Sequence, residues 1–339
     1  MFKFLRKIIS LIFGLIILIL AICEIKIPEK GIINLTYNTS YEKIAWDLNC
    51  IMHNPQKIYN SSIFIGPSWV QGGINDSILS NNGYQSLNFG VNHSGSDLDF
   101  YLVSRIVKYK PKIILLHRFP NGQDVFHPMM PLLMSPIEHF SIFKNYSIKF
   151  TLTYYPKRFY FVVKYLTLKI VNPFSLNKKY YSKFGWRSEG FKNIHLDKKN
   201  VIKILDEQKF FNIRLKNEYF NNSNILTWAN FKYKYIWRYF YSNFINGNGE
   251  NARVKTLLFC QLNHIKVAEI YVPHFADALY DSKFNDNQYY FKSKAIKETC
   301  YHLKNVSFLS EQKYWFDLDH LNTNGSNLFT DSILLVLPR

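Results

Sequence analysis

The sequence predicts an α/β domain in which a parallel sheet has helices on both faces. The short apolar runs SSIFIG and KIILLH are bounded by Gly, Pro and polar residues, as buried strands are. Between them, the apolar residues of SDLDFYLVSRIVKYK recur at helical spacing. Strands that alternate with helices in this way favour a parallel sheet over an antiparallel one.

The expected elements follow one another in two stretches of the chain. In the first stretch we expect a strand at 61–66, a helix beginning near Gly72, a strand at 84–90, a helix at 96–110 and a strand at 112–117. In the second we expect a helix at 251–266, a strand at 267–273, a helix at 289–305, the fifth strand at 306–310 and a last helix at 324–337. Residues 59–122 and 250–339 are therefore assigned to one sheet domain.

The N-terminus, residues 1–27, is expected to be a cytoplasmic tip and a transmembrane anchor. A basic start, MFKFLRK, precedes the uncharged run Ile8–Cys23. A helix that extends from Phe2 to Ile27 covers the ~30 Å of a bilayer's hydrocarbon core. Positive charge before the span and Glu24 after it place the N-terminus in the cytoplasm and the rest of the chain outside it. A cleaved signal peptide has a similar layout, but AIC is a poor cleavage site, which favours an uncleaved anchor.

Two further segments complete the expected organisation. Residues 28–58 are interpreted as a connector with one helix. Residues 123–249, crowded with Tyr, Phe and Lys, are interpreted as a mainly helical insertion. That insertion is expected to be a lid, or a surface where basic and aromatic residues meet lipid headgroups. Its apolar runs are too interrupted for a second span.

The formal net charge of +18 comes mostly from Lys residues scattered along the chain. No nucleic-acid motif accompanies them, so we expect no nucleic-acid partner. A general Lys-rich and Asn-rich bias is one explanation, and a basic surface facing anionic lipid or polysaccharide is the other.

Ser68 follows the first expected strand in the stretch IFIGPSWVQGG. Ligands of parallel sheets bind beyond the carboxyl ends of the strands, which is where this hydroxyl is expected. A serine at such a place is more often a turn or capping residue. The serine becomes a candidate nucleophile only if a base lies beside it.

WFDLDHLNTNG supplies such a base near the C-terminus. Asp317 and His320 are three residues apart, so one helical turn puts both on the same face. A serine nucleophile needs an imidazole base, and the imidazole needs a carboxylate that holds its tautomer. Asp319 is also near His320, but at that spacing it is expected to face elsewhere.

The motifs GPSW, NFGVNHSG and DLDHLNTNG resemble those of the SGNH (GDSL-like) hydrolase superfamily. The layout is similar to its membrane-anchored, extracytoplasmic members associated with acyl groups of surface polymers. The resemblance covers the two parts of the sheet domain and implies a flavodoxin-like three-layer α/β/α sandwich. Gly66-Pro67-Ser68 departs from the usual Gly-Asp-Ser of that family.

By this resemblance, Ser68 is the nucleophile, His320 the base and Asp317 the orienting carboxylate. The oxyanion donors it implies are the Ser68 N–H, a glycine after the second strand and an asparagine after the third. Gly90 and Gly95 are both candidates for that glycine. Asn121 is the candidate asparagine, although an Asn before a Gly is equally well explained as a turn residue.

The expected function is that of an extracytoplasmic serine esterase or O-acyltransferase. Its substrate would be an O-acyl group, most simply acetyl, on a cell-surface glycan or lipid-linked polymer. No cofactor is expected, and neither the cysteines nor the histidines have the spacing of metal ligands. The alternative is an inactive SGNH-type module that binds glycan or an assembly partner. The acyl group, the balance of hydrolysis against transfer and the oligomeric state are left open.

Overall fold

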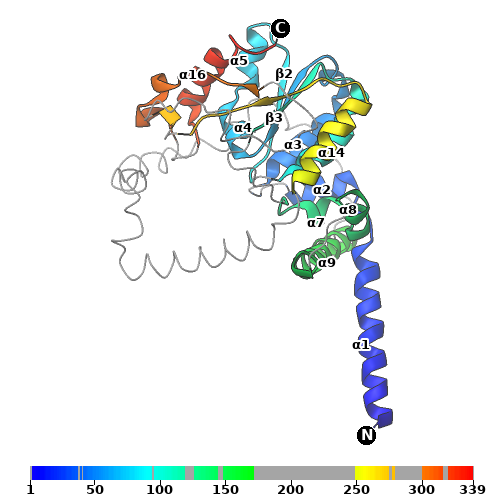
Figure 1. Ribbon diagram of the computed structural model, residues 1–339. Helices are drawn as coiled ribbons and strands as arrows, with labels where there is room; N and C mark the ends of the chain where they lie inside the picture. Colours follow the sequence, from blue (N-terminus) through cyan, green and yellow to red (C-terminus); the bar gives the residue numbers. More distant parts are fainter. Residues whose placement is uncertain are drawn as a thin grey trace, which may run out of the picture.

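A five-stranded, all-parallel sheet forms the centre of the computed structural model (Figure 1). The structure describes residues 2–36, 39, 41–93, 95–118, 126–143, 148–171, 249–274, 277–278, 300–315 and 320–338. The strand order is β2-β1-β3-β4-β5. The strands are β1 (Ser62–Gly66), β2 (Ser86–Gly90), β3 (Ile113–His117), β4 (Val267–Ile270) and β5 (Cys300–Tyr301).

The first three strands and the last two come from the two separated stretches of the chain, as the sequence predicted. β4 pairs with β3 in parallel, so the long intervening segment leaves the sheet and returns to the adjacent position. β1 pairs with β2 from Ser62↔Ser86 to Gly66↔Gly90, which brings the carboxyl ends of both strands to one level. The predicted parallel sheet with flanking helices is confirmed.

The position of the fifth strand was predicted wrongly. β5 is the two-residue segment Cys300–Tyr301, and the expected strand at 306–310 contains a 3-10 turn, η6 (Ser307–Leu309). Val306 and Leu309 are the buried residues of that segment, and a spacing of three fits a turn better than a strand. A two-residue edge strand has too few residues to carry an alternating pattern. Of the helix expected at 289–305, residues 289–299 lie outside the described ranges. Residues 300–301 of that segment form β5 instead of a helix.

Helices cover both faces of the sheet. Successive side chains of a strand point to opposite faces, and Ile63 and Ile65 of β1 belong to one cluster of buried apolar side chains while Phe64 belongs to another. Buried residues of α3, α6 and α14 join the first cluster, and those of α4, α5 and α16 join the second. The bounds of these helices are α3 Glu42–His53, α4 Ser68–Gly73, α5 Asp76–Asn81, α6 Ser96–Ile106, α14 Gly249–Leu262 and α16 Thr323–Ile333. The remaining short turns are η1 (Pro55–Lys57), η2 (Val107–Tyr109) and η7 (Gln312–Tyr314).

Residues 28–58 are more than the expected connector. They form two helices, α2 (Glu29–Thr36) and α3, and apolar side chains of both lie in the first core cluster. The ammonium group of Lys43 on α3 is 2.6 Å from Asp47 Oδ1 and donates to the backbone oxygen of Asn88 at 2.6 Å. This buried bridge fixes α3 to the second strand.

The described part of residues 123–249 is helical and lies near the N-terminal helix. It contains α7 (Met130–Leu133), α8 (Pro136–Phe143) and α9 (Ile148–Val171). Residues 123–125, 144–147 and 172–248 fall outside the described residues. α1 (Phe2–Cys23) projects from the domain beside them (Figure 1). Among the described residues, α1 is the one helix that is long and apolar enough to cross a membrane.

Candidate active site

Ser68 is the first residue of α4, directly beyond the carboxyl end of β1. The helix begins four residues earlier than the Gly72 start that we expected. Pro67 occupies the capping position with φ of −76°, close to the value that its ring imposes, and its carbonyl accepts the N–H groups of Val70 and Gln71. The chain therefore turns from strand to helix with the Ser68 side chain at the junction.

Two glycines let α4 lie unusually close to the sheet. A Cβ added at Gly66 would lie 2.6 Å from the Cβ of His117 and 2.7 Å from Val70. A Cβ added at Gly90 would lie 2.4 Å from the backbone nitrogen of Gln71 in the first turn of α4. Because neither position has room for a side chain, both glycines are required by packing. They set the position of Ser68 relative to β1 and β2.

Contacts on either side of His320 fix the chain before α16. Trp315 and Leu321 form an antiparallel bridge. The side chain of Asn322 accepts from the N–H of Gly325 at 3.0 Å and donates to the carbonyl of Lys313 at 2.6 Å. The Asn of HLNTNG is thus a helix cap that also ties residues on either side of His320 together. His320 directly precedes Leu321 of the bridge, so these contacts fix its position.

α16 is hydrogen-bonded to the turn between α4 and α5. These contacts bring the segment of Ser68 and the segment of His320 together. Thr330 Oγ1 accepts the backbone N–H of Asn75 at 2.9 Å, and the side chains of Asn75 and Asn327 are joined at 2.9 Å. Both contacts span more than 250 residues of sequence. They act at the far end of α4 from Ser68 and set the relative positions of the two helices.

Ser68 and His320 meet in a hydrogen bond. The Oγ atom of Ser68 lies 2.7 Å from Nε2 of His320, and both residues are half-buried, so the pair is accessible. A hydroxyl at this distance can pass its proton to the imidazole. Asp317 and Asn121, the other two side chains proposed for the site, lie outside the described residues.

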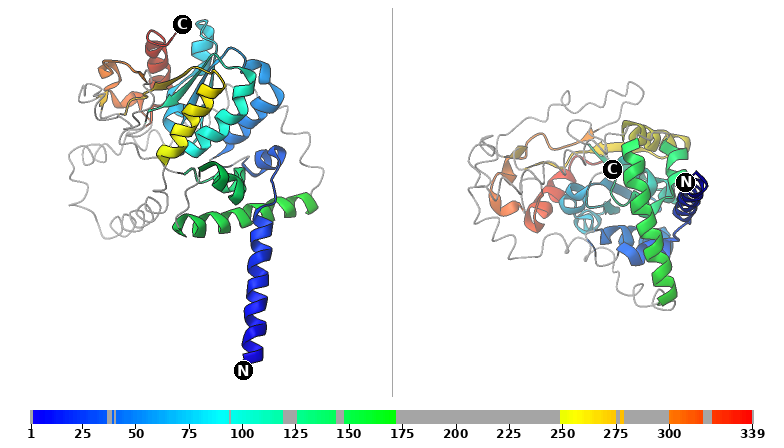
Figure 2. Two further views of the ribbon diagram at one scale, coloured as in Figure 1. Left: turned by 45° about the vertical axis from the view of Figure 1, so that its right-hand side comes forward. Right: turned by 90° about the horizontal axis from the view of Figure 1, so that it is seen from below.

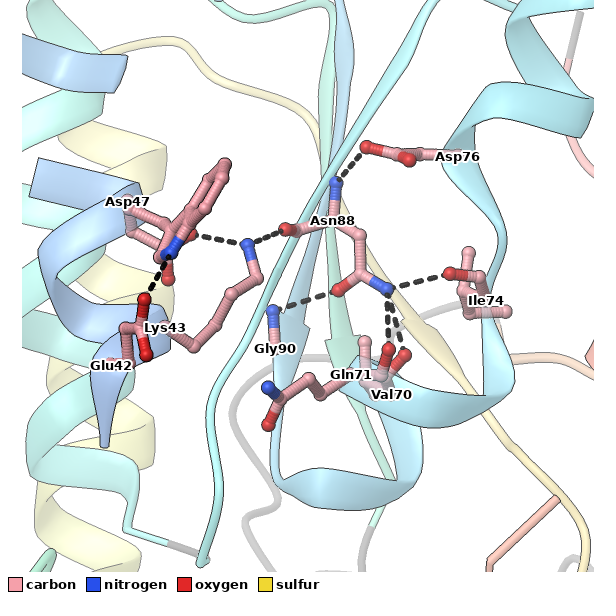
Figure 3. Close-up of polar contacts among 10 residues, drawn as sticks. Glu42, Lys43, Asp47, Val70, Gln71, Ile74, Asp76, Asn88 and Gly90 are labelled. Atoms are coloured by element: carbon pink, nitrogen blue, oxygen red, sulfur yellow. Dashed lines mark hydrogen bonds and ion pairs between the residues drawn. The ribbon is translucent and has the colours of Figure 1, made fainter. Parts of the chain in front are cut away.

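Asn88 fixes α4 from the second strand, and the sequence reasoning missed it. Its Nδ2 donates to the carbonyls of Val70 and Ile74 at 2.9 and 2.7 Å, and its backbone N–H donates to Asp76 Oδ2 at 3.0 Å (Figure 3). The carbonyls at the end of a helix lack partners within it, and this amide supplies one. An asparagine inside the apolar strand SLNFG was the available signal, because a buried amide must be hydrogen-bonded.

The two candidate oxyanion glycines have different surroundings. The N–H of Gly90 donates to Asn88 Oδ1 at 2.8 Å, so it is already engaged (Figure 3). Gly95 lies where β2 leads into α6, and a Cβ there would be 2.5 Å from the Cβ of His127. Nε2 of His127 is 2.8 Å from the carbonyl of Asn92, which holds the loop from β2 to Gly95 in place.

Aromatic rings flank Ser68 on the side of β3 and β4. The half-buried ring of Trp69 lies 5.3 Å from the ring of His117 and 4.5 Å from that of His274. Burial, with smaller effects of His274 and Arg253, holds the pKa of His117 well below its usual range, so this imidazole is neutral. Trp69 therefore contacts a neutral imidazole from the end of β3.

Arg118, the residue after His117, belongs to a buried ion cluster. Arg118 Nε lies 2.6 Å from Glu269 Oε2, and Arg253 Nη2 lies 2.7 Å from the other carboxylate oxygen. All three side chains are buried. This cluster links β3, β4 and α14 beneath the strand ends, and its function is structural.

No group of three or more His, Cys, Asp or Glu that could hold a metal occurs within the described residues. Comparison with known proteins found no family model, no curated protein and no solved structure that matches the chain. The chemistry of the site is therefore inferred from its own geometry.

Proposed function

We propose that this protein is a membrane-anchored serine esterase or O-acyltransferase of the SGNH type. The observation that carries the proposal is the 2.7 Å contact between Ser68 Oγ and His320 Nε2 at the carboxyl end of a parallel sheet. A partly exposed Ser–His pair at a strand-to-helix junction is the arrangement that nucleophilic acyl transfer requires. As a turn residue, Ser68 would need no imidazole at hydrogen-bond distance.

In the proposed reaction, Ser68 Oγ attacks the carbonyl carbon of an ester while its proton moves to His320 Nε2. The tetrahedral intermediate collapses when His320 returns this proton to the leaving alkoxide, and an acyl-serine remains. Water or a sugar hydroxyl then attacks the acyl-serine, and His320 takes the proton of that second nucleophile. The products are the free acid in hydrolysis or a new ester in transfer, and Ser68 is regenerated. Asp317 is assigned the role of holding the His320 tautomer.

The oxyanion donors in this proposal are the Ser68 N–H, the Gly95 N–H and the Asn121 amide. The first N–H groups of a helix have no acceptor within it, and Ser68 opens α4. Gly95 is preferred to Gly90 because the N–H of Gly90 already donates to Asn88. Loss of one such donor costs about 10²–10³-fold in rate.

Two features of the fold support the finer parts of the proposal. The strand order β2-β1-β3-β4-β5 is the order of flavodoxin-like sheets, in which ligands bind beyond the carboxyl ends of the strands. The apolar helix α1 suits an anchor that keeps the domain outside the cytoplasm, beside a glycan or lipid-linked polymer. An acetylated surface glycan is the substrate class that fits such a site.

The test uses the full chain in detergent micelles with p-nitrophenyl acetate and a fluorophosphonate probe. We expect ester hydrolysis and covalent labelling, both abolished in Ser68→Ala. Ser77→Ala is the matched control, because Ser77 is also half-buried and lies in the first turn of the next helix. Equal hydrolysis and labelling in Ser68→Ala and in the unchanged chain would refute the proposal.

A second pair of variants separates the two acidic residues beside the base. Asp317→Asn should lower the rate by about 10⁴-fold if Asp317 orients His320, because the wrong tautomer is then favoured. Asp319→Asn should leave the rate within a few fold. A large loss of rate in Asp319→Asn and a small one in Asp317→Asn would show that Asp319 orients His320.

The competing function is a module that binds glycan or an assembly partner without turnover. It predicts neither hydrolysis nor probe labelling with any acyl ester, together with binding that survives Ser68→Ala. The close Ser68–His320 contact favours the enzyme, since a binding module has no requirement for this pair.

A further inference from the structure

α9 carries a row of apolar side chains on the side that faces away from the domain. Leu152, Tyr160, Val163 and Ile170 are 66%, 57%, 40% and 80% exposed, and their spacing places them on one side of the helix. We call these four residues the outer face of α9. The opposite side is buried in the protein through Tyr154, Arg158 and Val162. Exposed apolar rows of this kind mark a surface that is covered in the working state of a protein.

The charged residues of α9 have one sign, and one of them lies beside this face. The helix contains Lys and Arg but no acidic residue. Lys164 is exposed next to the outer face, with its ammonium group 5.8 Å from the centre of the Tyr160 ring. A helix with an apolar face bordered by lysines and aromatic rings is typical of helices that lie in the plane of a membrane interface.

The buried side of α9 is hydrogen-bonded to the end of α1. The guanidinium of Arg158 donates to the carbonyls of Cys23 and Ile25, where α1 ends, and also to those of Pro131 and Leu132 in α7. One side chain thus joins α1, α7 and α9. Because the joint is buried and fully hydrogen-bonded, the orientation of α9 relative to α1 is fixed.

α9 lies crosswise to α1, between the sheet domain and the free length of α1 (Figure 2). Seen from the end of the molecule at which α1 projects, α9 runs across the near side of the domain (Figure 2). Its outer face is therefore turned in the direction in which α1 extends. A bilayer crossed by α1 would meet this face where α1 enters the domain.

We propose that the outer face of α9 binds the headgroup region of the membrane that α1 crosses, with a preference for anionic phospholipid. The outer face is continuous with α1, and Lys164 adds a positive charge beside it. The inference rests on the proposed anchoring by α1 and is independent of any catalytic activity. Contact at both α1 and α9 holds the domain at a defined height and tilt.

This orientation has a consequence for the Ser68–His320 pair. α16 begins three residues after His320 and runs toward the C-terminus, which lies at the far end of the molecule from α1 (Figure 1). The start of α16, which follows His320, lies at the end of that helix nearer α1 (Figure 1). A substrate held at the membrane surface is then presented to the carboxyl ends of the strands.

The experiment measures membrane contact at two leucines with an environment-sensitive fluorophore. Leu152→Cys and Leu335→Cys are each made in a Cys300→Ser background, because Cys300 is the half-buried cysteine while Cys23, Cys50 and Cys260 are buried. Leu335 is the matched control, 82% exposed and just beyond α16. The full chain is placed in nanodiscs of phosphatidylcholine and phosphatidylglycerol and labelled with an NBD maleimide. Quenching by lipids with nitroxides on the acyl chain then reports depth.

We expect the probe at residue 152 to emit at shorter wavelength and to be quenched at least threefold more than the probe at residue 335. We expect this difference to shrink in phosphatidylcholine alone. Equal quenching at both positions overturns the proposal. A blue shift at residue 152 without lipid quenching overturns it too, because it shows that another protein surface, such as a second copy of the chain, covers α9. Both variants alter exposed leucines, and unchanged melting temperatures exclude misfolding as the cause.

Discussion

Two histidines of this chain are each paired with an oxygen from a distant segment, and only one pair is placed to react. His320 lies 2.7 Å from Ser68 Oγ, and both residues are half-buried at the strand ends. His139 lies 3.3 Å from Asp97 Oδ2, and both side chains are fully buried. The comparison shows that accessibility distinguishes these pairs more sharply than hydrogen bonding does.

The buried pair has the properties of a structural contact. Oδ1 of Asp97 accepts the N–H groups of Leu98 in the first turn of α6 and of His127, so the carboxyl also holds the segment at His127 in place. Burial lowers the pKa of His139 to about 3 and raises the pKa of Asp97 well above its usual range. Both shifts favour the neutral forms, and with neither side chain exposed, no substrate reaches the pair. An Asp–His contact is thus insufficient evidence for catalysis.

The largest effect should come from removing the accessible imidazole. We expect His320→Ala to lower p-nitrophenyl acetate hydrolysis by about 10⁵-fold or more, a larger loss than that of Asp317→Asn, since Ser68 then has no base. The melting temperature of the full chain should stay within a few degrees, because His320 is not part of the core. A variant that keeps most of its activity would show that the 2.7 Å contact is not catalytic.

The same substitution in the buried pair should have the opposite pattern. His139→Ala leaves a cavity beside Phe126, Phe143 and Tyr154 and removes the partner of Asp97. We expect a loss of about 3 kcal/mol in the free energy of unfolding. Denaturant unfolding measures this loss, and the rate per folded molecule should change little. A large fall in the hydrolysis rate with unchanged stability would show that the Asp97–His139 pair, like the Ser68–His320 pair, takes part in catalysis.

Asn88 should have a smaller effect on both properties. Asn88→Ala leaves the last carbonyls of α4 without their buried donor, at a cost of about 2 kcal/mol. Ser68 should also lose part of its alignment, and we expect about a tenfold fall in kcat with little change in KM. Asn82→Ala is the control, because that asparagine is exposed and bonds only within its own helix. Equal effects of the two substitutions would exclude a positioning role for Asn88.

The smallest effect concerns the pH dependence of stability. Burial lowers the pKa of His127 to about 3, whereas the unfolded side chain titrates near 6.5. Between these values the unfolded chain binds a proton that the folded chain does not, so stability falls as the pH falls. Each such histidine lowers the free energy of unfolding by about 1.4 kcal/mol for each unit by which the pH falls between the two pKa values.

His127→Gln should flatten the decline in unfolding free energy between pH 6 and pH 4 by that amount, measured by urea unfolding in detergent. Glutamine suits the test because it can still donate to Asn92 and accept from Met129, as the imidazole does. Identical slopes for the variant and the unchanged chain would show that His127 is protonated in the folded state.

Much of the sheet was predictable because its strands carry strong local signals. β1 and β3 are short apolar runs that end at Gly66 and at the polar His117, and each was placed within a residue of its observed bounds. β5 was missed because an edge strand of two residues has no pattern to detect. The start of α4 was misplaced because Gly72 and Gly73 indicate a turn, whereas they lie inside the helix.

The candidate site was predictable in part for the same reason. Ser68 and His320 lie in short motifs that can be read locally. By contrast, the role of Asn88 depends on the carbonyls of Val70, Gln71 and Ile74. The pairing of Asp97 with His139 spans 42 residues. Such contacts leave no local periodicity, so they become visible only when distant segments are placed side by side.

The amino-acid order alone determined the apolar N-terminal helix, the strands β1 to β4 and the residue types at their ends, because each depends on neighbours close along the chain. Only the tertiary structure shows that His320 contacts an accessible hydroxyl and that His139 is buried in the core. Burial and proximity are properties of the packed molecule, and they set both the protonation of a side chain and its access to substrate.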